Sequence, residues 1–115
     1  MKLIRKSFIA ENKSKFYGYL YEIETKDDIT LIIDKIKRDN KGYRHLPYAY
    51  RLSNTAGKSD DKEPGMIGMQ FLNILKRNEL NNHLLLVLRY YGGTKLGASL
   101  LLRTYSKCAN LCINK

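Results

Sequence analysis

The chain has 115 residues, of which 43% are hydrophobic and 28% are charged, a composition typical of a folded globule rather than a disordered chain. This length predicts a single domain over residues 1–115, with one core and no second domain. No apolar stretch is long enough to cross a bilayer, and the N-terminal MKLIRKSFIAENK forms no signal-peptide core. We therefore expect a cytoplasmic protein without a membrane partner.

The net charge is the strongest compositional signal. Twenty-one lysines and arginines against eleven aspartates and glutamates leave a formal charge of +10. A positive surface attracts polyanions before specific contacts form, and nucleic acid is the commonest polyanion. The alternative is that the charge only keeps the chain soluble, because the basic residues are scattered and form no long run.

The N-terminal quarter predicts a β-hairpin. Leu3 to Ala10 and Lys15 to Ile23 alternate and are rich in aromatic residues, as strands are. The polar segment Glu11 to Ser14 between them suits a turn. Three tyrosines of the second strand share one face, which would be open to a ligand if helices cover only the other face: Tyr17, Tyr19 and Tyr21.

A helix follows, with Thr25 as its N-cap and Gly42 as its stop. Leu46 to Leu52 predicts a third strand, and Ser53 to Lys62 predicts a polar loop. A second helix should begin near Glu63–Pro64, since proline is tolerated in a first turn.

The remaining segments complete the fold prediction. The apolar run His83 to Tyr90 predicts a central strand buried on both faces, and a third helix should begin near Ala98. The order ββαβαβα predicts an α+β two-layer sandwich, with a mixed four-stranded sheet and its helices on one face. Cys108 and Cys112 lie on one face of the last helix and are interpreted as core thiols, and no cofactor or metal is predicted.

The turn GGTKLG has the ingredients of an anion site. It matches neither the phosphate loop of nucleotide-binding enzymes nor the dinucleotide-binding fingerprint. However, Gly92 and Gly93 allow successive amides to converge, a helix N-terminus follows, and Lys95 adds a positive charge. The alternative is that these glycines only turn the chain and that Gly97 allows close packing.

The segment SDDKEPG places Asp60, Asp61 and Glu63 within four positions. Such acids could hold a hard cation or act as acid and base in hydrolysis. Alternatively they cap the second helix, because Asp60 and Glu63 have the spacing of a capping box.

The strand HLPYAYRL carries a histidine, two tyrosines and an arginine: His45, Tyr48, Tyr50 and Arg51. If the tyrosines are exposed, they could stack on nucleic-acid bases. If they are buried, they are ordinary sheet packing. A lone histidine is more often structural than catalytic.

In this order, the motifs HLPYAYRL, SDDKEP and RYYGGTKLG resemble those of the IMPACT/YigZ family, specifically its N-terminal domain. The resemblance covers nearly the whole chain and departs from the family pattern at Lys62, where a glycine is usual. It implies a fold similar to a small-subunit ribosomal protein and to the fourth domain of translocation factor EF-G. It also implies a link to the control of translation.

We therefore predict a non-catalytic binding module linked to translation regulation, contacting RNA, the ribosome or a translation-regulatory protein. The residues predicted to bind the anion or nucleic acid are Arg51, Tyr48, Tyr50, Arg89, Tyr91, Gly92, Gly93, Lys95 and Gly97. The alternative is a metal-assisted phosphoester hydrolase that uses Asp60, Asp61 and Glu63, with His45 nearby. Neither the oligomeric state nor the specific partner follows from the sequence.

Overall fold

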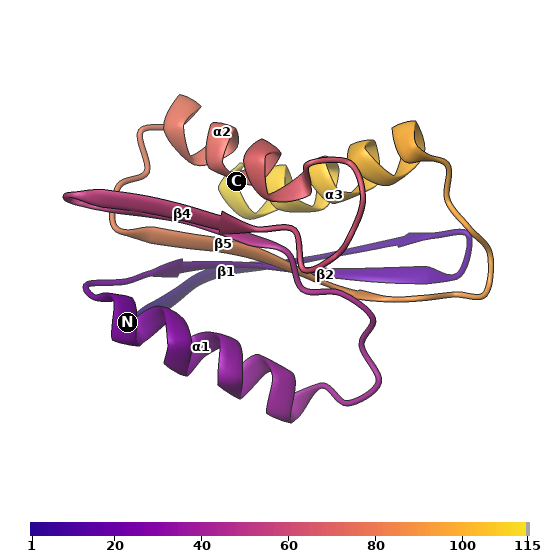
Figure 1. Ribbon diagram of the computed structural model, residues 1–115, viewed down its shortest axis with the longest axis horizontal. Coiled ribbons are helices and arrows are strands. Elements are labelled where there is room, and N and C mark those ends of the chain that lie inside the picture. The colour runs from indigo at the N-terminus through magenta and orange to yellow at the C-terminus, as the bar shows by residue number, and fades with distance from the viewer. Residues whose placement is uncertain (115) are drawn as a thin grey trace.

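The computed structural model describes residues 1–114 and shows one β-sheet with helices on both of its faces (Figure 1). The five strands are antiparallel and lie in the order β1-β2-β5-β3-β4. In chain order the elements are β1 (Lys2–Glu11), β2 (Ser14–Glu22), α1 (Lys26–Asp39), β3 (Tyr48–Leu52), β4 (Thr55–Ser59), α2 (Ile67–Arg77), β5 (His83–Tyr90) and α3 (Ala98–Ile113).

The α+β class is confirmed, but the predicted four-stranded mixed sheet is wrong. The segment predicted as a polar loop contains β4, which pairs with β3 from Tyr48–Ser59 to Leu52–Thr55. An edge strand needs no run of apolar residues, so the sequence TAGKS carries little strand signal. The extra hairpin reverses the chain once more, and β5 consequently runs antiparallel to β3.

The prediction that all helices lie on one face is also wrong, and the molecule has three layers rather than two. The apolar face of α1 packs on one side of the sheet, against a cluster that includes Tyr19, Leu84 and Leu86. Helices α2 and α3 pack on the opposite side, against Phe16, Leu85 and Val87 (Figure 1). Because alternate residues of β5 point to opposite faces, both sides of this strand are core.

The β1–β2 hairpin is confirmed. Asn12 and Lys13 form its turn with φ of 48° and 69°, the left-handed pair of values that two-residue hairpin turns require. Asparagine adopts this conformation readily, whereas lysine does so at a cost. The hairpin thereby ends beside the loop that leaves β5, and this contact positions the site described below.

The two cysteines are buried and unpaired, as predicted for core thiols. Burial raises the pKa of Cys108 to about 11 and also raises the pKa of Cys112. Both thiols are therefore protonated at neutral pH and are poor nucleophiles. Ser7 on β1 donates a hydrogen bond to the Cys108 carbonyl oxygen at 2.7 Å, which holds α3 against the sheet.

No helix among residues 1–114 combines the length and the apolar character that crossing a membrane requires.

Candidate functional site: a buried ion pair beneath a basic pocket

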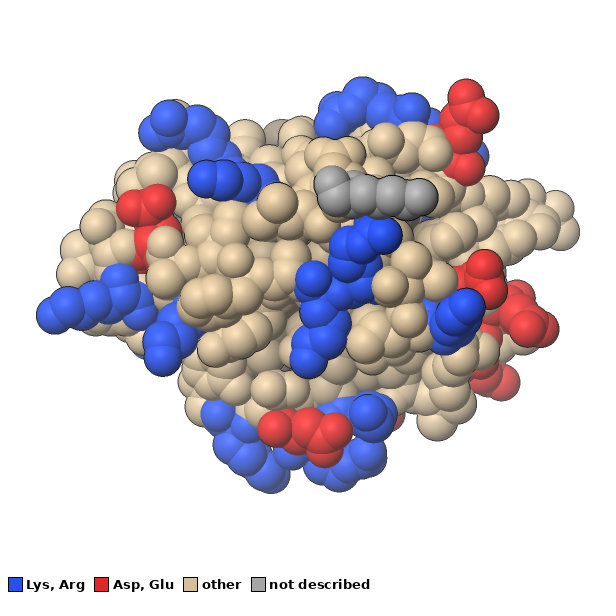
Figure 2. Space-filling view, turned by 180° about the vertical axis from the view of Figure 1, so that it is seen from behind, with Lys and Arg blue, Asp and Glu red and all other residues tan. Residues whose placement is uncertain are grey.

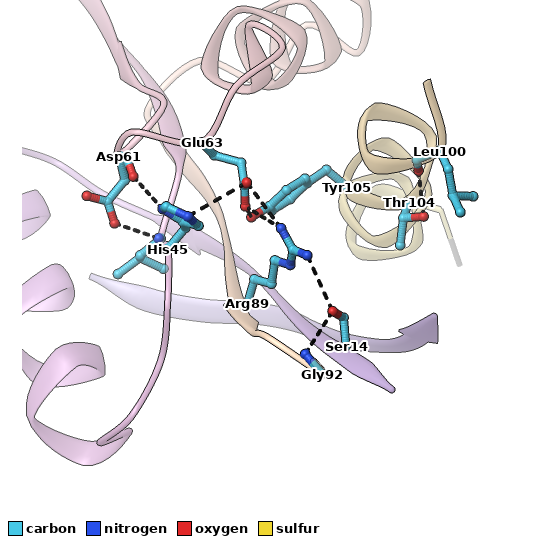
Figure 3. A network of polar contacts seen from close by, with 10 residues as sticks. Ser14, His45, Asp61, Glu63, Arg89, Gly92, Leu100, Thr104 and Tyr105 are labelled. Carbon is cyan, nitrogen blue, oxygen red and sulfur yellow. Dashed lines mark hydrogen bonds and ion pairs between the residues drawn. The ribbon is translucent and has the colours of Figure 1, made fainter. Parts of the chain in front are cut away.

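The centre of the site is a buried ion pair between Arg89 at the end of β5 and Glu63 in the segment before α2. Arg89 is 6% exposed and Glu63 is 4% exposed. Arg89 Nη1 lies 3.1 Å and 3.0 Å from the two carboxylate oxygens of Glu63. Tyr105 of α3 donates its hydroxyl hydrogen to the same carboxylate. The pair therefore joins β5, α3 and the segment before α2 (Figure 3).

Tyr105 is held as a neutral donor. Burial raises the pKa of Tyr105 far above its usual range, and the hydrogen bond to Glu63 and the charge of that carboxylate raise it further. The phenol consequently keeps its proton throughout the physiological range. It adds a hydrogen bond from a neutral donor to a carboxylate whose other hydrogen bonds come from the charged Arg89.

Ser14 links this ion pair to the glycine turn. Its buried hydroxyl oxygen accepts hydrogen bonds from Arg89 Nη2 at 3.4 Å and from the Gly92 amide at 3.2 Å (Figure 3). Arg89 Nε is the one buried side-chain nitrogen or oxygen without a hydrogen-bond partner in the described part of the chain. A buried donor of this kind is uncommon and marks a place where polar groups are not fully satisfied by the protein.

His45 occupies the opposite side of Glu63. Its Nδ1–H donates to the carbonyl oxygen of Asp61 at 2.7 Å, and its Nε2 lies 3.7 Å from Glu63 Oε1. Two backbone hydrogen bonds, Arg44 N–H to Arg89 O at 2.8 Å and Arg89 N–H to His45 O at 2.9 Å, fasten this segment to β5. The histidine ring is thus held through Nδ1, and its Nε2 faces the carboxylate of Glu63.

The three acids do not share one site. Asp60 accepts a hydrogen bond from the Gly68 amide in the first turn of α2, and Asp61 accepts one from the Leu46 amide, both at 2.7 Å. Glu63 belongs to the buried ion pair. Within residues 1–114 no three His, Cys, Asp or Glu residues are grouped so that they could hold a metal ion. Asp60 therefore caps α2, although from eight residues before Gly68 rather than by the predicted capping box.

Lys62 has a left-handed backbone, with φ of 65°. This is the position at which the resembled motif carries glycine, and only glycine adopts such a conformation without cost. The departure seen in the sequence therefore falls on a residue whose backbone conformation favours glycine.

A pocket of about 360 Å³ opens over the ion pair. Its lining combines the pair with exposed basic groups from the segment before β3 and from the turn after β5. The lining residues are Arg44, His45, Glu63, Pro64, Arg89, Tyr91, Lys95, Leu96 and Leu101. Because Arg89 balances the charge of Glu63, the net charge of the pocket comes from Arg44 and Lys95.

The turn between β5 and α3 supplies the wall of the pocket. The Gly92 amide donates a hydrogen bond to Ser14, whereas the amides from Gly93 to Gly97 have no acceptor within residues 1–114. Gly97 is the N-cap of α3 and has no side chain to satisfy the first amides of the helix. These amides and the exposed Lys95 give this end of α3 a positive potential.

Tyr91 lies between the basic groups. The guanidinium carbon of Arg44 is 4.7 Å from the centre of the Tyr91 ring, and that of Arg89 is 5.7 Å away. Such cation–π contacts hold the arginines and the ring together. Of the predicted binding residues, the structure therefore brings together Arg89, Tyr91, Lys95 and the glycine turn.

Three predicted binding residues lie elsewhere. Arg51 is paired with His83, at the other end of β5 from Arg89. Tyr48 and Tyr50 are half-buried and pack against the α1-side cluster, and the Tyr50 ring lies over Gly57 of β4. The two tyrosines thus serve sheet packing, which was the alternative interpretation of this motif.

Sequence reasoning did not assign Ser14, Arg44 or Tyr105 to the site. Ser14 looked like an ordinary turn residue, and Tyr105 looked like one more member of an apolar helical stripe. The one available signal for Tyr105 was its hydroxyl group, since a buried tyrosine needs a hydrogen-bond partner.

Replacing Gly92 with alanine is expected to lower the free energy of unfolding by about 1–3 kcal/mol, the usual cost of overpacking. A Cβ atom there would lie 2.1 Å from the backbone carbon of Lys13, so the hairpin and the turn would have to separate. Gly97→Ala is the matched control, because nothing lies within 4 Å of its Cβ position. Urea unfolding of both variants measures the difference, and equal stabilities would contradict the close approach.

Comparisons with known proteins place this chain within a family. Residues 12–113 match the Impact N-terminal domain. The chain is 34% identical over 110 residues to the IMPACT family member YvyE of Bacillus subtilis (strain 168), covering 92% of this chain and 51% of YvyE. It is 30% identical over 96 residues to the protein IMPACT homolog of Dictyostelium discoideum, covering 77% of this chain and 28% of that protein. The chain thus spans about half or less of these relatives.

Two solved structures share the fold. One, described as a hypothetical protein, superimposes with a TM-score of 0.86 and 25% identity over 97% of this chain and 58% of the other. The other, the two-domain translational regulator Yih1, superimposes with a TM-score of 0.60 and 18% identity over 95% of this chain and 46% of Yih1. The match over residues 12–113 and the identity to YvyE show that the chain belongs to the IMPACT family and contains its N-terminal domain.

Proposed function

We propose that this chain is a non-catalytic RNA-binding module that acts in the regulation of translation. The observation that carries the proposal is the pocket in which Arg44 and Lys95 stand beside the free amides of the turn between β5 and α3. Phosphate oxygens are suited to such a site, because they accept hydrogen bonds from amides and from cationic side chains together. The charge of the buried Arg89 is balanced by Glu63, but its Nε has no acceptor beneath the pocket floor.

The overall charge supports an anionic partner without choosing the contact surface. Figure 2 shows basic side chains in several separate groups on one face, with acidic side chains among them. The +10 charge therefore supplies a general attraction to RNA, and the pocket supplies the place where a phosphate is held. The proposed link to translation rests on membership of the IMPACT family.

No observation favours the hydrolase alternative. Each of its three carboxylates already accepts hydrogen bonds from protein groups, and Glu63 is closed off by Arg89 and Tyr105. His45 is likewise held by the Asp61 carbonyl. The geometry supports structural roles for these residues, with the pocket formed above them.

The test is RNA binding measured by fluorescence anisotropy while the salt concentration is varied. If about three phosphates are contacted, the affinity for single-stranded RNA should fall roughly 20-fold between 50 and 200 mM salt. Absence of RNA binding, with direct binding of a purified translation-regulatory protein instead, would replace RNA with a protein partner. An affinity for RNA that does not change with salt concentration would contradict the proposal that the pocket binds phosphate.

A further inference from the structure

A second feature near the pocket is an aromatic surface on the other face of the sheet. We propose that Phe8, Tyr17 and Tyr90, flanked by Lys13 and Lys15, form a platform on which unpaired RNA bases stack. This inference rests on the proposed function and specifies its ligand as single-stranded rather than double-stranded RNA. We define these five residues as the aromatic platform.

The aromatic platform is the part of the α1-side face that α1 leaves uncovered. The buried residues of α1 pack on a cluster that includes Tyr19, Ile23 and Leu88. Beyond Leu88, at the end of the strands, none of the helices within residues 1–114 covers the face (Figure 1). Helix α1 ends at Asp39, and its C-cap residue Asn40 lines a cavity at this end of the face. The tyrosine-rich face of β2 is thus covered at one end and open at the other.

The strand register places the three aromatic residues and Lys15 on this one face, and Lys13 follows in the hairpin turn. Phe8 pairs with Tyr17, Tyr17 pairs with Leu88, and Lys15 pairs with Tyr90. Directly paired residues of antiparallel strands point to the same side, and Leu88 belongs to the α1-side cluster. All of these side chains therefore point to the α1 side.

The rings form a continuous row across three strands. The ring centres of Phe8 and Tyr17 are 5.0 Å apart, and those of Tyr17 and Tyr90 are 6.0 Å apart. Phe8 is 50% exposed, which is unusual for a phenylalanine on a sheet face. Tyr17 and Tyr90 are half-buried, but both line a surface cavity. This row of rings on an antiparallel sheet suits bases, because every base has a flat face that can stack.

The surrounding charge favours an anionic chain. A cavity of about 530 Å³ lies over the Tyr17 and Tyr90 part of the platform, next to Phe8 across the Phe8–Tyr17 contact. It is lined by Lys13, Lys15, Tyr17, Asn40, Tyr90 and Tyr91, with no carboxylate among them. The nearest acid of α1, Asp39, is within 4 Å of Lys35 and Arg38. Glu11 of β1 lines a different cavity beside α3. Because no carboxylate lines this cavity, Lys13 and Lys15 can bind the phosphates that flank a stacked base.

Tyr91 connects the platform to the phosphate pocket. Tyr91 lines both cavities, which lie on opposite sides of the end of the sheet. The guanidinium carbon of Arg44 lies 4.7 Å from the centre of the Tyr91 ring. A single strand could therefore pass round Tyr91, with a phosphate over the turn and the neighbouring bases on the platform. A duplex keeps its bases stacked on one another and could use only the phosphate pocket.

The test compares three labelled nucleic acids of similar charge: a uridine 10-mer, the same strand without bases, and a short RNA duplex. Tyr17→Leu and Phe8→Leu should each weaken binding of the uridine strand about 5-fold or more. Binding of the abasic strand and of the duplex should not change. Tyr17→Phe should bind normally, since it keeps the ring.

Tyr21→Leu is the matched control, because Tyr21 lies on the same face of β2 but lines a different cavity, beside α1. Thermal melting of each variant separates loss of binding from loss of fold, and Phe8 is exposed enough for its variant to fold. If the wild type binds all three nucleic acids and the leucine variants bind the uridine strand as tightly as the wild type, bases do not stack on the platform. The proposed phosphate site would not be affected by that result. Equal weakening toward all three also overturns the platform. If the wild type binds no RNA, both proposals fall.

Discussion

Replacing Glu63 with alanine is expected to lower the free energy of unfolding by about 3–5 kcal/mol, the usual cost of removing one partner of a buried ion pair. Arg89 would remain in the interior with its charge uncompensated, and Tyr105 would lose the acceptor of its hydroxyl. For a domain of this size such a loss is a large part of the total stability. Urea unfolding at neutral pH measures it.

Two further variants make this prediction specific. Glu22→Ala removes an exposed carboxylate and should change stability by no more than about 0.5 kcal/mol. The double replacement Glu63→Leu with Arg89→Met should recover much of the loss, because an apolar pair of similar volume avoids the cost of burying charge. A Glu63→Ala protein as stable as the wild type would show that Arg89 does not depend on this carboxylate.

The second large effect is expected on RNA binding. The double replacement Arg44→Gln and Lys95→Gln should weaken single-stranded RNA binding about tenfold at 0.1 M salt. It should also reduce the slope of log affinity against log salt by about 1.4, since each lost phosphate contact on a single strand removes about 0.7. Both residues are exposed lining residues of the pocket, so the fold should persist. Anisotropy titrations at several salt concentrations give both quantities.

The matched control removes the same charge elsewhere. Lys76 and Arg77 are exposed in the last turn of α2, at the end of that helix remote from Glu63. Lys76→Gln with Arg77→Gln should leave the slope nearly unchanged. Equal effects of the two double variants would mean that RNA responds to net charge alone and not to the pocket.

The arrangement separates two tasks that the sequence places in one motif. In RYYGG, Arg89 is buried and holds β5, α3 and the segment before α2 together, whereas Tyr91 stands at the surface beside Arg44. Replacing Arg89 would therefore lower the stability of the domain, and any loss of RNA binding in that variant would include the effect of unfolding. The exposed Arg44 and Lys95 are the residues whose loss reports on RNA alone.

Local sequence rules determined most of the elements and the family. Hydrophobic period, caps and turn residues predicted the hairpin, the three helices and the buried β5, because these signals act over a few neighbouring residues. The predicted start of the second helix near Glu63–Pro64 was wrong: α2 begins at Ile67, because Glu63 is held in the buried ion pair before the helix. The order of the motifs pointed to the IMPACT family, which the match over residues 12–113 confirms. The edge strand β4 escaped prediction because its partner β3, not its own composition, makes it a strand.

Only the tertiary structure decided how these parts form a site. The members of the polar network come from separate parts of the chain, and no local sequence pattern predicts that they meet: Ser14, His45, Glu63, Arg89 and Tyr105. Exposure was decided in the same way: α1 covers Tyr19 but stops short of Tyr17, although both belong to one alternating strand. Spacing along a strand determines which side chains share a face, whereas packing between distant segments determines which part of that face remains open to a ligand.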